Sequence, residues 1–216
     1  MSEDPILEYI DGLGEVIENI GDEIIDEKSE KYEEDVILKS ILAIREGDRY
    51  SIDTIEGSNH LLVSFSYNVK DDFMSMEMNN KGENDVEKIK QTNSHVKLSS
   101  EDYQQLSESA DETMTEFFAS IGDDVAERFH VAVLDKLKNS SVCYNVNQQQ
   151  GLVSGFEVYT KLFPLEEDIS HKEFYDTVTS ILSTGRPTRA YIQYSYGLRN
   201  FEEGTIYSQE QLNPKF

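Results

Sequence analysis

The chain has 216 residues, a length that suits one large domain or two small ones. It carries 43 acidic and 19 basic residues, and a net charge of −24 is repelled by nucleic-acid phosphates and by anionic membranes, so neither is expected as a partner. Cys143 is the single cysteine, so no internal disulfide can form. No apolar stretch is as long as a membrane span, and the acidic start is unlike a signal peptide. We therefore expect a cytoplasmic protein.

Residues 1–35 form an acidic segment that we expect to be helical, with 14 acidic and two basic residues. Its apolar residues recur at alternating spacings of four and three, at Ile6, Ile10, Leu13, Ile17, Ile20 and Ile24. Pro5 after Asp4 suits the start of this helix. The apolar stripe either docks on its own domain or is offered to another chain. In the second case residues 5–27 form a homodimer contact, with Ile10 and Ile17 as candidate binding residues.

Residues 36–122 form the first α+β half. The spacing of Leu38, Ile41 and Leu42 predicts a helix over 32–46, and two strands are predicted over 49–56 and 61–69. We expect a further edge strand over Phe73–Met78, a polar loop or short strand over 79–95, and a helix over 99–120.

Residues 123–197 form the second half, followed by a C-terminal tail over 198–216. The pattern predicts a helix over 123–138, a hairpin of strands 142–146 and 152–163, a helix over 170–183 and a strand over 189–196. Gly185 and Pro187 are expected to stop the second helix. The helix starts at Ser99 and Ser170 share capping chemistry, which leaves open a duplicated α-β-β-α-type unit.

The element order predicts an α+β fold in which helices pack on one or more antiparallel sheets. The strands in Arg49–Val69 and the stretches Gly155–Tyr159 and Ile169–Phe174 resemble the type III secretion chaperone-like fold, which YbjN-type sensory-transduction regulators share. This resemblance implies a non-catalytic protein, often dimeric, that holds peptide segments or partner proteins.

No phosphate-binding loop and no metal-binding motif occurs in the sequence. The four histidines stand far apart along the chain, and Cys143 is interpreted as a packing residue. We therefore assign no catalytic residue, metal or cofactor.

Met74, Met76 and Met78 alternate along the chain, so a strand would place all three on one face. Ordinary core filling, a peptide-holding groove and a Cu(I) site are three interpretations of this triplet. We treat the three methionines as candidate binding residues.

The sequence thus favours a non-catalytic, acidic protein that binds a protein or peptide partner, in a chaperone-like manner. Two alternatives remain: an enzyme of unrecognised class with an acidic or tyrosine-lined pocket, and a polyanionic mimic of nucleic acid. The acidity also fits adaptation to high salt.

Overall fold

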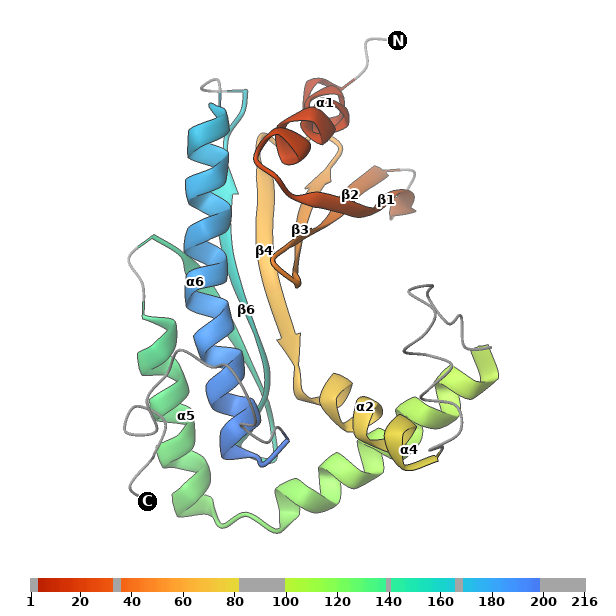
Figure 1. Cartoon of the computed structure of the whole chain (residues 1–216), viewed down its shortest axis with the longest axis vertical. Coiled ribbons are helices and arrows are strands. Elements are labelled where there is room, and N and C mark those ends of the chain that lie inside the picture. The colour runs from red at the N-terminus through yellow and green to blue at the C-terminus, as the bar shows by residue number, and fades with distance from the viewer. Residues whose placement is uncertain (1–3, 33–35, 82–99, 139–140, 166–168, 199–216) are drawn as a thin grey trace. The chain divides into compact units, whose positions relative to one another are not determined.

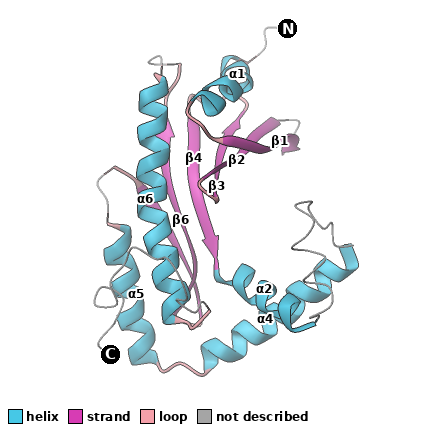
Figure 2. Cartoon of the chain, viewed as in Figure 1, coloured by secondary structure: helices cyan, strands magenta, loops and turns pink. Residues whose placement is uncertain are grey.

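The computed structural model describes residues 4–32, 36–81, 100–138, 141–165 and 169–198. These residues form five helices and a six-stranded antiparallel sheet with helices packed against it (Figures 1 and 2), which confirms the predicted α+β class. The strand order is β1-β2-β3-β4-β6-β5.

The chain divides into two compact units. Unit 1 comprises residues 1–67, 135–145 and 156–189, and unit 2 comprises residues 68–134, 146–155 and 190–216. Both predicted halves, 36–122 and 123–197, contribute to both units. Five elements also contribute residues to both: β4 (Leu61–Asn68), α5 (Asp123–Leu137), β5 (Cys143–Gln149), β6 (Leu152–Leu162) and α6 (His171–Ser195).

Unit 1 opens with α1 (Pro5–Asn19), which begins as the sequence predicts. The Asp4 carboxylate accepts the Ile6 N–H at 3.0 Å and caps the helix. The apolar stripe docks on its own unit, because four of its six members are buried: Ile6, Ile10, Leu13 and Ile17.

The helix prediction is wrong for residues 21–32, and residues 33–35 lie outside the described residues. Gly21 has a φ of +86°, and the Asp22 N–H bonds to the Ile17 carbonyl at 3.1 Å, so a left-handed turn closes the helix. The chain then continues as β1 (Glu23–Tyr32), which contains Ile24. Glycine therefore ends the helix here.

The helix predicted over 32–46 is also wrong, because this segment is β2 (Val36–Arg45). Strand β2 pairs with β1 on one side and with β3 (Asp48–Ile55) on the other. Ile41 and Ala43 are buried at alternate positions, as period-2 burial requires. The apolar spacing of this short run is compatible with either a helix or a strand. Hydrogen bonding to β1 and to β3 makes it a strand.

Strands β3 and β4 (Leu61–Asn68) confirm the predicted strands over 49–56 and 61–69. The β5–β6 hairpin confirms the hairpin that was predicted around Gln148–Gly151.

Helix α6 begins where the sequence predicts and ends much later. The Ser170 hydroxyl caps it by accepting the Glu173 N–H at 3.1 Å. The helix then continues through Gly185 and Pro187 to Ser195, so the strand predicted over 189–196 is wrong.

Unit 2 contains α2 (Val69–Lys81), α4 (Ser100–Ala119) and α5 (Asp123–Leu137) up to Leu134. Helices α4 and α5 confirm the helices predicted over 99–120 and 123–138. The edge strand predicted over Phe73–Met78 is wrong, because α2 occupies it. Asn68 caps α2 by accepting the Lys70 N–H at 3.0 Å, and Asp71 and Asp72 stand in its first turn.

The core of unit 2 is aromatic. The Tyr196 ring lies 4.8 Å from the Phe129 ring and 5.5 Å from the Phe118 ring, between centroids. Most of the predicted 79–95 loop and the helix start at Ser99 lie outside the described residues. Duplication of the α-β-β-α unit therefore stays a prediction.

Candidate protein-binding surface

The sheet of unit 1 has one face covered by helices. Helix α1 packs on that face, where the Lys39 ammonium bonds to the Leu7 carbonyl at 3.3 Å. Helix α6 packs on the same face, where Gly185 lies against the ring of Phe65 (Figure 1). The opposite face has no helix of this unit over it among the described residues. We call it the open face.

The open face carries aliphatic side chains from three adjacent strands, all at least partly exposed: Val36, Leu38, Leu42, Ile44, Ile55 and Leu62. Ile55 is 43% exposed and pairs with Leu38 across β2 and β3. An antiparallel sheet with one solvated face usually alternates apolar and polar side chains. A cluster of partly exposed aliphatic residues, with Ile55 the most exposed, instead favours a surface that contacts another molecule.

Hydrogen bonds join the strands at the centre of the open face. The Ser51 hydroxyl bonds to the Asp53 carboxylate at 2.7 Å and to the Ser64 hydroxyl at 3.0 Å. The Ser40 hydroxyl also donates to Asp53. These bonds fix three neighbouring strands, so the surface is preformed.

The open face carries charges of both signs. The strand register and the alternation of side chains assign eight charged residues to it. Five are acidic and three are basic: Glu23, Asp26, Glu30, Asp53, Glu157, Lys28, Arg49 and Lys161. The exposed side of α1 differs sharply, because that helix has four acidic residues and no basic residue. The open face is thus less acidic than the helix on the other face.

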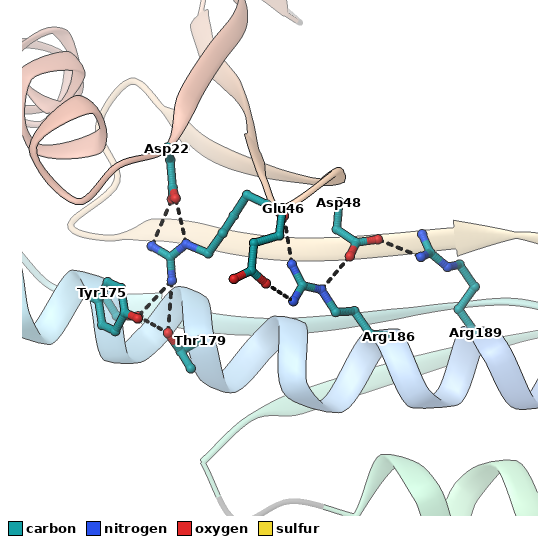
Figure 3. Close-up of polar contacts among 8 residues, drawn as sticks. Asp22, Glu46, Asp48, Tyr175, Thr179, Arg186 and Arg189 are labelled. Atoms are coloured by element: carbon teal, nitrogen blue, oxygen red, sulfur yellow. Dashed lines mark hydrogen bonds and ion pairs between the residues drawn. The ribbon is translucent and has the colours of Figure 1, made fainter. Parts of the chain in front are cut away.

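On the covered face, a buried ion pair joins β2 to the turn before β1 (Figure 3). The Arg45 guanidinium bonds to both oxygens of Asp22, at 2.6 and 2.9 Å, and to the Thr179 hydroxyl of α6 at 2.9 Å. The Tyr50 hydroxyl donates to Asp22 at 2.6 Å. Burial is the larger cause that raises the pKa of Tyr50, and this hydrogen bond is the second cause. The Asp22 side chain is only 2% exposed.

A second group lies along α6 in the same view (Figure 3). Arg186 bonds to Glu46 at 2.7 Å and also pairs with Asp48, and Arg189 reaches the other oxygen of Asp48 at 2.6 Å. Removing one partner of the buried Arg45–Asp22 pair costs about 3–5 kcal/mol, since the other charge stays buried. The Arg186–Glu46 pair contributes less, because the Glu46 side chain is 76% exposed. We therefore interpret both groups as clamps that hold α6 and the β2–β3 hairpin on the covered face.

The structure places Ile10 and Ile17 in the core of unit 1, at 1% and 0% exposure. A partner can reach these side chains only if α1 undocks. Their role in binding stays a prediction.

The three methionines do not share a face as a strand would require, because they lie in α2. Residues two apart on a helix point in nearly opposite directions. Accordingly Met74 is 9% exposed and Met76 is 41% exposed, while the side chain of Met78 lies outside the described set. Their role as binding residues stays a prediction.

The open face was not predicted from the sequence, because residues 32–46 were expected to form a helix. The signal was present in Val36–Arg45, where apolar residues occupy both parities of a short run. A strand of this composition has apolar side chains on both of its faces, so each face is expected to pack against another element or another molecule.

The structure describes His60, His130, His171 and Cys143, and it does not gather them into a metal-binding group. Three or more residues placed to hold a metal do not occur in the described part of the chain. His130 lies beside Gln148 in unit 2, and Cys143 is exposed on β5 rather than packed. Partial burial and the nearby Lys161 lower the pKa of His60. None of the described helices has both the length and the apolar character to cross a bilayer.

An uncharacterised protein from Methanothermobacter thermautotrophicus, known from a crystal structure, has a similar fold. The TM-score is 0.55 and 10% of the aligned residues are identical, over 88% of this chain and 98% of the other. This likeness concerns the fold alone. No protein-family model matches the sequence, and no curated protein matches it.

Proposed function

We propose that this chain is a non-catalytic protein-binding protein and that its partner docks on the open face of unit 1. The observation that carries the proposal is the aliphatic cluster centred on Leu38, Leu42 and Ile55, which no described helix of that unit covers. Covering such side chains stabilises a complex by about 25 cal/mol per Å² of apolar area removed from water.

The chemistry of the face defines the partner. A matching surface is apolar opposite Leu42 and carries charges of both signs opposite residues such as Arg49 and Asp53. A strongly basic partner would fit the acidic side of α1 better than this face. We place the interaction in the cytoplasm, because a single cysteine forms no internal disulfide and suits a reducing compartment.

A photo-crosslinking amino acid at position 55 tests the proposal in living cells that express the full chain. The control carries the same amino acid at Val131 of α5, a more exposed aliphatic position at 60% against 43% for Ile55. We expect position 55 to yield covalent protein adducts on irradiation and position 131 to yield few. The adducts are mapped to partner residues by mass spectrometry.

Because Val131 is the more exposed of the two, a stronger signal at 55 would reflect docking and not accessibility. Equal labelling at the two positions, or adducts on charged loops instead of an apolar surface, would contradict the proposal.

A further inference from the structure

We infer that the occupant of the open face is a second copy of this chain, docked face to face about a two-fold axis. The inference rests on the proposed function and names its partner. It differs from the contact through residues 5–27 expected from the sequence, because the α1 stripe is buried within its own unit.

Charge restricts how two copies can meet. Each copy carries −24, so most pairs of surfaces repel. An approach through α1 would set Glu8, Asp11, Glu15 and Glu18 against the same four residues with no basic residue of that helix between them. The open face interleaves three basic with five acidic residues, so it is the better surface of the two for self-contact.

The register places one apolar residue, Leu42, in the row along which the axis would run, together with Asp26 of β1, Ser51 and Ser64. Leu42 lies opposite Ser51, and Ser51 lies opposite Ser64, so these three residues form one row across β2, β3 and β4. Take an axis along this row, midway between two facing sheets, which pack about 10 Å apart. Leu42 of one copy then meets Leu42 of the other at the centre of the contact.

The same axis makes the charges of β3 complementary. Arg49 and Asp53 lie two residues on either side of Ser51 and point to the same face. A two-fold rotation about the row reverses the strand direction, so Arg49 of each copy faces Asp53 of the other. Such a contact is isologous, and each ion pair occurs twice.

Charge reversal provides a test with its own control. Arg49→Asp and Asp53→Lys are each made in the full chain, and circular dichroism first verifies that each variant folds. The association of wild type, of each variant and of their equimolar mixture is measured by sedimentation equilibrium in 0.15 M salt. We expect wild type to dimerise and each variant alone to bind itself at least about tenfold more weakly, because like charges then meet twice.

The mixture distinguishes this geometry from a general effect of either substitution. When the two variants meet, the carboxylate introduced by Arg49→Asp faces the ammonium introduced by Asp53→Lys. The unchanged Arg49 of one variant faces the unchanged Asp53 of the other, so we expect a heterodimer with about wild-type affinity. A monomeric wild type at 100-fold above cellular concentration would overturn the inference. So would a dimer that both variants leave unchanged, or a mixture that does not associate.

Different results would contradict the two proposals, which are that a protein docks on the open face and that this protein is a second copy of the chain. Cross-linking from position 55 to a different protein, with a monomeric wild type, would keep the proposed function and remove the second copy. Absence of specific adducts from position 55 together with a monomeric chain would remove both. A dimer that cross-links from position 131 and not from 55 would also remove both.

Discussion

The absence of a side chain at Gly185 lets α6 approach β4 within unit 1. A Cβ atom at this position would lie at most 3.0 Å from three carbons of the Phe65 ring, which is closer than such atoms pack. From the sequence this glycine was expected to stop the helix, because glycine is common at helix ends. The helix continues instead, and the residue is needed for close packing.

Gly185→Ala is expected to destabilise unit 1 by about 1–3 kcal/mol, the usual cost of overpacking a core. The loss is read from the urea midpoint of the circular dichroism signal. Gly12→Ala is the matched control, since Gly12 is also helical and has no atom within 4 Å of a Cβ, so it is expected to gain up to about 1 kcal/mol. Adding Phe65→Leu should recover part of the Gly185→Ala loss; additive effects would argue against the ring contact as its cause.

At the scale of elements, the sequence predicted best where local signals agreed with tertiary contacts. The cap at Ser170, the cap at Asp4 and the alternation in β4 are local features, and the structure confirms all three. Prediction failed in β2 and in the second half of α6, where partners far along the chain decide. Strand β2 is set by pairing with β1 and β3, and α6 continues because it packs on β4.

The candidate surface could not be predicted for the same reason. A face is open or covered according to where α1 and α6 pack, and no local pattern encodes that choice. Strand β1 shows the limit most clearly, since six of its ten residues are charged and it has little intrinsic preference for a strand.

Helix α2 separates two methionines that a strand would have placed together. Met74→Ser is expected to destabilise unit 2 by about 2–5 kcal/mol, because a buried apolar side chain is lost. Met76→Ser is expected to change stability by no more than about 0.5 kcal/mol, because Met76 is exposed. Urea unfolding of the two variants measures both values.

Equal costs at the two positions would contradict the helical assignment of α2. If Met76→Ser weakens partner binding while stability is unchanged, the sequence-based proposal for a methionine contact gains support. The comparison within one helix keeps composition and chain context constant.

At the scale of the whole molecule, the acidic charge and the tyrosines act in different pH ranges. The formal net charge of −24 at pH 7 discourages unspecific contacts and favours surfaces where basic residues are interleaved with acidic ones. Buried hydroxyls become important only at alkaline pH. Each unit contains at least one tyrosine of this kind.

Three tyrosines are expected to make the protein sensitive to alkaline pH. Burial is the main cause that raises the pKa of Tyr50, Tyr191 and Tyr196 above the ordinary value of 10.0. Unfolding restores the ordinary value, so above about pH 10 the unfolded chain binds fewer protons than the folded one. The free energy of unfolding should therefore be highest below pH 10 and fall as the pH rises above it.

Tyrosinate absorbance measures this directly when native protein and protein in concentrated urea are titrated side by side. The urea sample should ionise all twelve tyrosines around pH 10, and the native sample should hold back about three until it unfolds. Urea midpoints at pH 8 and pH 10.5 should differ, with the lower midpoint at pH 10.5. Superimposable titrations of the two samples would mean that the three hydroxyls reach solvent, and the cores described for both units would then be too open to account for the fold.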